Sequence, residues 1–280
     1  MRVNKLLVIL FCLIMHTVHG LTGQIDVVIA CHEKDARTLE LAIDGIKKHG
    51  KNVARIIVVS AKKITDNAEW IDEGIYPFTK NDVALNLFHH NQEDANAYMS
   101  DPDNRIGWMY QQLLKLYAPL VIPDISPNVL VLDADTIFLR DVTFIDDQGY
   151  ALFNTSIEKY QEPYFEHMGR LLPGLKNIRK QYPAICHHML FQRHIIVDLF
   201  HEISAQHNIE PWQALLRCID RKELFAGISE YEIYFNFVFS RDYKVKMRPL
   251  RYIDMAFNKQ NVMKCQQHGY EYVSCHAWKS

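Results

Sequence analysis

The chain has 280 residues, of which 49% are hydrophobic and 23% charged, and its formal net charge is −2 with histidine neutral. These values exclude a largely disordered chain, because the apolar content is sufficient for a sizeable core. They also exclude a general nucleic-acid binder, which needs a cationic face, and the sequence has no Lys/Arg-rich run. The length suits one α/β domain.

Residues 1–20 have the features of a secretory signal peptide. Two basic residues, Arg2 and Lys5, precede an unbroken apolar run over residues 6–15, and small residues follow it. The run is short for a membrane span, which needs about 20 apolar residues. We expect cleavage after position 20 and export to the periplasm, the cell exterior or the lumen of a secretory organelle. The alternative is an uncleaved anchor, and only then would the protein associate with a membrane.

The cysteine count bears on the redox state of an exported protein. The sequence has six cysteines, and cleavage of the leader would remove Cys12. The odd number that remains implies at least one free thiol. Cys265 and Cys275 are close enough in sequence to bridge a loop. No CxxC pair is present, so the sequence does not predict a structural zinc site.

The first half of the chain begins with a predicted strand–helix–strand unit. Residues 25–30 (IDVVIA) and 55–60 (RIIVVS) are short, β-branched apolar runs that are typical of buried parallel strands. Residues 39–49 between them have helical spacing and end at Gly50, a suitable C-cap. A βαβ unit of this kind predicts a mostly parallel sheet.

A second strand–helix pattern follows after a polar interval. Residues 64–105 are polar and irregular, and we expect a long connection with short helices there. Residues 107–120 then predict a helix that ends near Pro123, and residues 128–135 (NVLVLDAD) predict the third buried strand.

The second half of the chain predicts mainly helices. A strand is expected over residues 188–192, and helices are expected over 195–207, 211–219 and 229–239. Residues 158–180 contain two prolines and two glycines. We interpret this segment as a mobile stretch of the surface and a candidate lid over a bound ligand.

Two carboxylates, Asp133 and Asp135, follow the apolar residues of the third strand. Side chains two residues apart on a strand face the same way, and open α/β sheets bind ligands at the carboxyl ends of their strands. Two adjacent carboxylates near a core are costly unless a cation neutralises them. A divalent cation, Mg²⁺ or Mn²⁺, suits these oxygens and those of a diphosphate. The alternative is that both residues only end the strand and cap a turn.

The haloacid-dehalogenase motif is a second interpretation of the same residues. It is also an apolar strand followed by D-x-D, and its first aspartate is a nucleophile. There a Thr or Val stands four residues after that aspartate, whereas here the position is Ile137 and Thr136 comes one place early. That motif lies on the first strand, whereas here two strands precede it. A phosphotransferase or phosphatase that uses Asp133 is therefore the alternative function.

Four blocks of sequence, in this order, carry a resemblance: IDVVIACHEKD (25–35), GWMYQQLLKL (107–116), VLDADTIFL (131–139), and HHMLFQR with SEYEIYFNFV (187–193 and 229–238). Together they resemble the GT-A class of glycosyltransferases. More narrowly, they resemble a domain-of-unknown-function family of nucleotide-sugar transferases in bacteria and large viruses. The resemblance implies one α/β domain, residues 21–280, with a mostly parallel central sheet flanked by helices. Residues 21–135 would bind the nucleotide, and residues 136–280 would form the acceptor half.

The function that this resemblance implies is that of a metal-dependent glycosyltransferase, moving a hexosyl or related group. The donor would be a UDP- or GDP-sugar, the cofactor Mn²⁺ or Mg²⁺, and the acceptor a glycan, lipid or protein. A catalytically inactive secreted protein that binds a sugar or a nucleotide is the remaining alternative.

The resemblance also implies which residues meet the donor. Residues 31–35 would border the nucleotide, with Lys34 and Asp35 as candidates to contact phosphate and base or ribose. The alternative is a solvated turn that caps the next helix. Gln111 and Lys115 share one helical face and are candidates to reach the donor. The alternative for both is the solvated edge of an ordinary amphipathic helix.

A histidine near the C-terminus often completes a GT-A metal site beside the D-x-D carboxylates. With Asp133 and Asp135, the resemblance implies His276 as the third ligand, and His268 is its competitor. A neutral imidazole is an acceptable ligand of Mn²⁺. Asp133 would also border the bound nucleotide, and Lys279 is a candidate for a phosphate contact.

Acid–base chemistry has two candidate carboxylates. An inverting transferase needs a base, and Glu230 and Glu232 are the candidates. However, Ser229 and Glu232 also fit a capping box, which explains Glu232 without any chemistry. His187 and His188 precede the strand 188–192 and are candidates to line the acceptor side, although a structural role is as well supported.

Overall fold

The structure is a computed structural model that describes residues 23–155, 161–178 and 183–276. The expected signal peptide and Lys279 lie outside the described residues. Among the residues that the structure does describe, no helix is long and apolar enough to cross a membrane.

A five-stranded sheet forms the centre of the molecule, in the order β3-β2-β1-β4-β7. The first four strands are parallel to one another, and the edge strand β7 runs antiparallel to β4. This confirms the predicted α/β class with a mostly parallel sheet. The strands are β1 (Ile25–Ala30), β2 (Val53–Ser60), β3 (Glu69–Asp72), β4 (Asn128–Leu132) and β7 (His188–Gln192).

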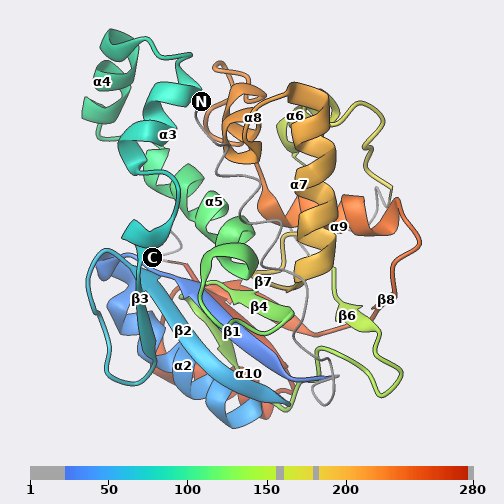
Figure 1. The fold of residues 1–280 in the computed structure, drawn as a ribbon. Helices are drawn as coiled ribbons and strands as arrows, with labels where there is room; N and C mark the ends of the chain where they lie inside the picture. The colour runs from blue at the N-terminus through green and yellow to red at the C-terminus, as the bar shows by residue number, and fades with distance from the viewer. Residues whose placement is uncertain (1–22, 156–160, 179–182, 277–280) are drawn as a thin grey trace.

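Helices cover both faces of this sheet (Figure 1). The predicted helix after the polar connection is α5 (Ile106–Val121), which lies on one face with α7 (Arg193–His207). The opposite face is covered by α2 (Ala36–His49), the predicted helix that ends at Gly50. Two more predicted helices are confirmed as α8 (Pro211–Arg217) and α9 (Glu230–Phe239).

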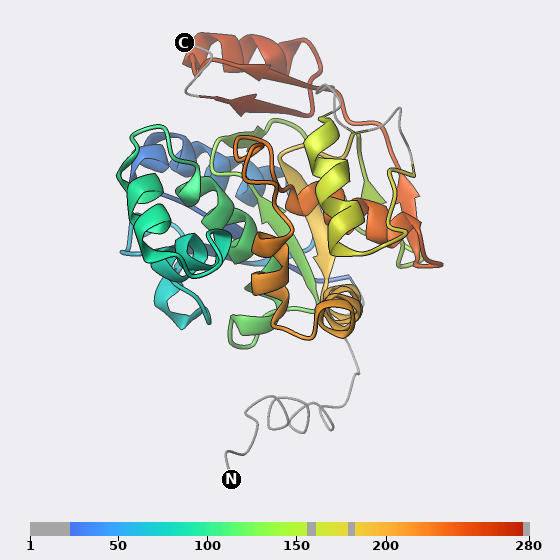
Figure 2. The same ribbon diagram turned by 90° about the horizontal axis from the view of Figure 1, so that it is seen from above.

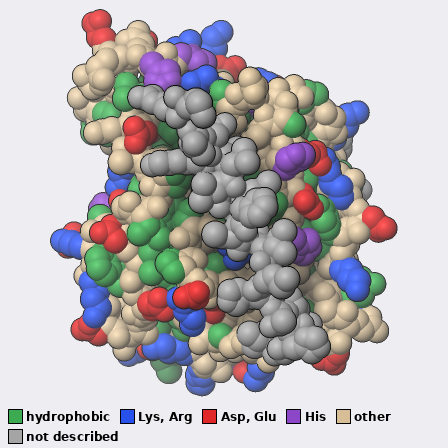
Figure 3. Space-filling model, in the orientation of Figure 1, with side chains coloured by type: hydrophobic (Ala, Val, Ile, Leu, Met, Phe, Trp, Pro, Cys, Tyr) green, Lys and Arg blue, Asp and Glu red, His purple; other side chains and the backbone are tan. Residues whose placement is uncertain are grey.

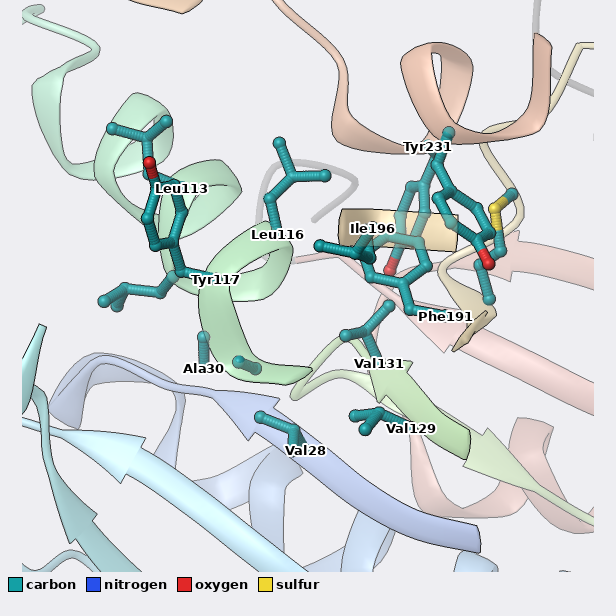
Figure 4. Close-up of a cluster of buried hydrophobic side chains, with 14 of the residues drawn as sticks. Val28, Ala30, Leu113, Leu116, Tyr117, Val129, Val131, Phe191, Ile196 and Tyr231 are labelled. Carbon is teal, nitrogen blue, oxygen red and sulfur yellow. The ribbon is translucent and has the colours of Figure 1, made fainter. Parts of the chain in front are cut away.

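The core lies between the sheet and the helices above it (Figure 4). Its buried side chains include Val28 of β1, Val131 of β4, Leu116 of α5 and Phe191 of β7. All four side chains are fully buried. Burying one aliphatic or aromatic side chain of this size stabilises a fold by about 1.5–3 kcal/mol. The apolar strands of the sequence are therefore buried on both faces, as parallel strands require.

The polar connection after β2 contains more structure than predicted. It holds the edge strand β3, which the sequence analysis missed, because Glu69–Asp72 is short and mostly exposed. The expected short helices are present as α3 (Lys80–Leu87) and α4 (Gln92–Ser100). Thr79 and Asp82 close a capping box at the start of α3.

A second, three-stranded sheet lies beyond α2. It consists of β5 (Thr136–Phe138), β10 (Tyr272–Cys275) and β9 (Tyr252–Met255). In this sheet β10 is antiparallel to β5 and parallel to β9. Figure 2 shows β9 and β10, with α10 (Lys259–Gln267), along one side of the molecule. Gly45 of α2 packs against β5 so closely that an added Cβ would lie 2.8 Å from the Phe138 carbonyl oxygen.

The remaining described elements are short. A parallel pair joins β6 (Ala151–Phe153) to β8 (Val245–Met247), and two 3₁₀ turns are η1 (Glu33–Asp35) and η2 (Glu73–Ile75). Within the segment expected to be a mobile lid, residues 161–178 include α6 (Glu162–Leu171), which buries His167 and Met168.

The described cysteines are all free, so Cys265 and Cys275 do not form the bridge that their spacing would allow. Cys275 is buried in β10, whereas Cys265 is half-buried in α10. On the face shown in Figure 3, acidic and basic side chains are interspersed, in keeping with the small net charge.

Candidate functional site

Asp133 and Asp135 stand at the junction of the two sheets. Asp133 directly follows β4, and its carbonyl accepts a hydrogen bond from the N–H of Thr136 at 3.1 Å, which turns the chain into β5. The carbonyl of Asp135 accepts from the N–H of Cys275 in β10 at 2.9 Å. The D-x-D pair therefore lies at the carboxyl end of β4, as the sequence predicts, but in the turn after the strand, because β4 ends at Leu132 and not at Asp135.

The Asp133 carboxylate has partners on both oxygens. Oδ1 accepts from Lys115 Nζ at 2.5 Å and from the Tyr231 hydroxyl at 3.1 Å. Oδ2 lies 3.2 Å from His187 Nδ1. Burial alone would raise the pKa of this carboxyl, but Lys115 and His187 outweigh it and hold the pKa well below its usual range. Asp133 is therefore a fixed negative charge.

Lys115 of α5 joins two carboxylates in the interior. Its ammonium lies 2.7 Å from Glu230 Oε1 as well as 2.5 Å from Asp133, and the side chain is only 3% exposed. Burial would lower the pKa of Lys115, but the two carboxylates raise it above its ordinary value. Burial also raises the pKa of Glu230 despite the neighbouring ammonium. The predicted donor-contacting lysine is thus committed to two internal ion pairs.

His187 is held in an unusual backbone conformation. Its φ is 63°, in the left-handed region that non-glycine residues seldom adopt and that is over-represented at functional sites. The turn lets its carbonyl accept from the N–H of Asp133 at 2.9 Å, while its ring lies between Asp133 and Asp254. Burial would lower the pKa of His187, but its hydrogen bonds to these two carboxylates raise it to about 10.

His276 extends β10 into the same cluster. Its N–H donates to the Met255 carbonyl at 2.9 Å, so the residue continues alongside β9. Its Nδ1 lies 3.1 Å from Asp135 Oδ2, and its Nε2 lies 3.5 Å from Asp254 Oδ1. Burial would lower its pKa, but the hydrogen bonds to Asp135 and Asp254 raise it to about 9. The structure thus brings His276 beside the D-x-D pair.

Asp254 of β9 is a site residue that the sequence analysis missed. Its Oδ1 lies 3.2 Å from His187 Nε2, and burial would raise its pKa, but the two histidines hold it below its usual range. No local motif marks it, because it lies alone in a four-residue strand. Only the pairing of β9 with β10 carries it to the cluster.

The cluster has the composition of a divalent-cation site. It contains four carboxylates (Asp133, Asp135, Asp254 and Glu230), two imidazoles and the Lys115 ammonium, which pairs with Asp133 and Glu230. Ligand atoms of His187, Asp254 and His276 all lie within 4.8 Å of one another. Carboxylate oxygen and imidazole nitrogen are suitable ligands for divalent ions, so the donor set fits a cation.

The other candidates for donor binding lie at the end of β1. Lys34 is exposed in η1, where its N–H donates to His32 Nδ1 at 3.2 Å, so this loop is a capped turn. Burial raises the pKa of Asp35, Lys34 partly offsets this, and the charge of Asp135 raises it further. Gln111 of α5 donates from Nε2 to the Ala30 carbonyl at 2.8 Å.

Two further candidates are buried among structural contacts. The Glu232 carboxylate accepts from the N–H of Ala184 at 2.9 Å and from Asn236 Nδ2 at 3.1 Å. The His188 ring packs against the rings of Phe138 and Tyr272, and burial lowers its pKa to about 3.

A separate surface pocket of about 540 Å³ lies between the end of α6, α7 and the residues after α9. Its lining includes Leu172, Glu202 and Arg241, and none of the cluster residues. The chemistry-bearing side chains are therefore concentrated at the sheet junction and not at this pocket.

Residues 24–268 match a family of unknown function, DUF6492. The chain belongs to this family. Because the match spans β1 through the start of the loop after α10, the DUF6492 core includes the D-x-D pair, Lys115, His187 and Asp254. No curated protein matches the chain in sequence.

Several solved structures are similar to this DUF6492 protein in overall fold. Mouse xyloside xylosyltransferase 1 in its apo form has a TM-score of 0.45 and 9% identity, covering 92% of this chain and 99% of that chain. An active-site mutant of LgtC has a TM-score of 0.42 and 16% identity, covering 89% and 86%. The galactosyltransferase LgtC with donor and acceptor sugar analogues has a TM-score of 0.40 and 17% identity, with the same coverage. These likenesses concern the fold.

Proposed function

We propose that this DUF6492 protein is a metal-dependent glycosyltransferase that takes a sugar from a nucleotide-sugar donor. The observation that carries the proposal is the cluster of four carboxylates, two imidazoles and one ammonium at the carboxyl edge of a parallel sheet. Open α/β sheets bind their ligands at this edge. The carboxylate oxygens and imidazole nitrogens there suit a divalent cation, and a diphosphate is a ligand that such a cation attracts.

The donor would lie between the cluster and the loop after β1. The charges of Asp135 and Asp133 raise the pKa of Asp35, and the exposed Lys34 is its neighbour in η1. Lys34 would then contact a phosphate and Asp35 the ribose or base of a UDP- or GDP-sugar. A bound Mn²⁺ or Mg²⁺ would neutralise the nucleoside diphosphate as it leaves, a stabilisation of several kcal/mol.

Residues of the chain itself would keep the site in shape while the sugar moves. Lys115 holds Asp133 and Glu230 at fixed positions, and Gln112 accepts the N–H of Glu230 at 2.9 Å. Of the two carboxylates predicted for acid–base work, Glu230 belongs to the cluster, and it is the catalytic candidate. Glu232 acts through its contacts with Ala184 and Asn236.

Nucleotide binding by the full chain is the first test. Thermal unfolding is followed with each nucleoside diphosphate, with and without Mn²⁺. A ligand at about 100 times its Kd should stabilise the fold by about 2.7 kcal/mol. We expect stabilisation only when metal and one matching nucleotide are both present, and we expect Asp135→Asn to remove it. Asp146→Asn serves as the control, because the half-buried Asp146 pairs with Lys246, away from the cluster.

Other outcomes would contradict the proposal or support an alternative function. A folded protein that responds to no nucleotide–metal pair contradicts the proposal. Phosphate incorporated on Asp133 would instead support the dehalogenase-type alternative. Binding without donor turnover, in the presence of glycan, lipid and protein acceptors, would indicate an inactive binding protein.

We also propose that the protein is exported, on the strength of the basic, then apolar, then small residues of positions 1–20. Mass spectrometry of the mature N-terminus would test cleavage after position 20. An intact Met1 terminus on a membrane-bound protein would support the anchor, and one on a cytosolic protein would contradict export.

A further inference from the structure

We propose that a transition-metal ion is held by the Nε2 atoms of His187 and His276 together with the carboxylate of Asp254. In this arrangement Asp133 and Asp135 do not bind the ion, but hold the opposite ring nitrogens of the two histidines. The inference rests on the metal dependence of the proposed function, and it identifies the atoms that would provide it.

The geometry of the three side chains carries the first step. Asp254 Oδ1 lies 3.2 Å from His187 Nε2 and 3.5 Å from His276 Nε2. One ligand atom from each of the three side chains lies within 4.8 Å of the other two. Two ligands that are each about 2.1 Å from one ion are at most about 4.2 Å apart. The tripod therefore needs only small side-chain movements to surround an ion.

The D-x-D carboxylates carry the second step. Asp133 Oδ2 lies 3.2 Å from His187 Nδ1, and Asp135 Oδ2 lies 3.1 Å from His276 Nδ1. Metal-binding histidines commonly donate their other ring N–H to a carboxylate, which fixes the tautomer and the ring orientation. With the proton on Nδ1 in each ring, both Nε2 lone pairs point toward Asp254.

The contacts of Asp133 argue against direct binding of the ion by this residue. Its Oδ1 already accepts from Lys115 and Tyr231, and its Oδ2 faces His187. Moving the carboxylate onto an ion would break a buried ion pair with Lys115, which is 3% exposed. Leaving a buried ammonium with one fewer partner is costly.

The two imidazoles also favour a transition metal. Their ring centroids are 4.8 Å apart, which places both rings beside one position. Imidazole suits Mn²⁺ less well than Fe²⁺ or Zn²⁺, and it suits Mg²⁺ poorly, because Mg²⁺ prefers oxygen ligands. We therefore expect Zn²⁺, Fe²⁺ or Mn²⁺ to bind and Mg²⁺ to compete weakly.

The test is X-ray absorption spectroscopy of the full chain loaded with one equivalent of Zn²⁺, because imidazole ligands give a distinct scattering signature. We expect two imidazoles in the wild type, and one in His187→Gln and in His276→Gln. His201→Gln is the matched control, since His201 is exposed on α7, and it should keep two. Asp133→Asn and Asp135→Asn should also keep two, with Zn²⁺ affinity about 10–100-fold lower.

A wild-type site with a single imidazole, unchanged in His187→Gln, would overturn the inference in favour of direct binding by Asp133, Asp135 and His276. Failure of the folded protein to bind Zn²⁺ would overturn it too, together with metal dependence. If two imidazoles are found but no nucleoside diphosphate binds, the metal site stands and sugar transfer fails. The wild-type spectrum needs no variant, so poor folding of His187→Gln does not leave the question open.

Discussion

Replacement of Lys115 by methionine tests whether the buried ion pairs hold the site together. Met is close to Lys in length, so packing is largely kept, whereas the only ammonium between Asp133 and Glu230 is lost. Removing one partner of a buried ion pair costs about 3–5 kcal/mol, because the remaining charge is left unpaired. For a chain of this size, that corresponds to a fall in Tm of about 10 °C.

The assay is chemical and thermal unfolding of the full chain followed by circular dichroism, for wild type and Lys115→Met. Lys246→Met is the matched control, because Lys246 lies 2.6 Å from Asp146 but its side chain is 42% exposed. An exposed pair contributes at most about 1 kcal/mol. The double variant Lys115→Met with Glu230→Gln should recover part of the loss. If Lys115→Met and Lys246→Met lose the same small amount of unfolding free energy, the reasoning is refuted.

Three further outcomes follow from buried contacts. Burial lowers the pKa of His167 from 6.5 to about 4, so its neutral form is favoured on folding, and about 3 kcal/mol of stability should be lost as pH falls from 6.5 to 4. Unfolding of His167→Gln, measured over that pH range, should show a shallower loss; an identical slope would contradict this. Gly45→Ala should lower the free energy of unfolding in urea by about 1–3 kcal/mol, because the added Cβ would meet the Phe138 backbone. Gly169→Ala is the control and should not destabilise the protein, because a Cβ there meets nothing within 4 Å. Glu232→Gln should lower the Tm yet keep donor turnover within about tenfold of the wild type, since its contacts are structural; complete loss in a folded protein would assign it to the chemistry.

The parts of the fold that the sequence predicted are those where one local pattern suffices. The strands β1, β2 and β4 are apolar runs, α5 has clear helical spacing, and the N-cap Ser229 marks the start of α9, so local patterns specify these elements. By contrast, β3 is mostly exposed and lacks that pattern. It forms because the edge of β2 offers unpaired backbone groups, which is a property of the assembled sheet.

The site divides in the same way. Asp133 and Asp135 can be recognised in the sequence, because two closely spaced carboxylates follow an apolar run. Lys115 was chosen as a donor contact from its helical face, but only the packing of α5 against α9 reveals that it pairs with Glu230. Asp254 has no neighbouring signal at all, and strand pairing alone connects it to His276.

The junction between the two sheets has a consequence for local opening of the fold. β10 joins β5 through contacts that are far apart in the chain, such as that between Thr136 and Ser274, 138 residues apart. Such closures are entropically expensive, and a short sheet that lies beside the central sheet can open locally. An ion bound by His187 beside the central sheet and by Asp254 and His276 of the outer sheet would oppose separation of the two sheets. Amide hydrogens of β9 and β10 would then exchange quickly in the metal-free protein and slowly in the metal-loaded protein. Those of β1 and β4 would exchange at the same rate with and without the ion.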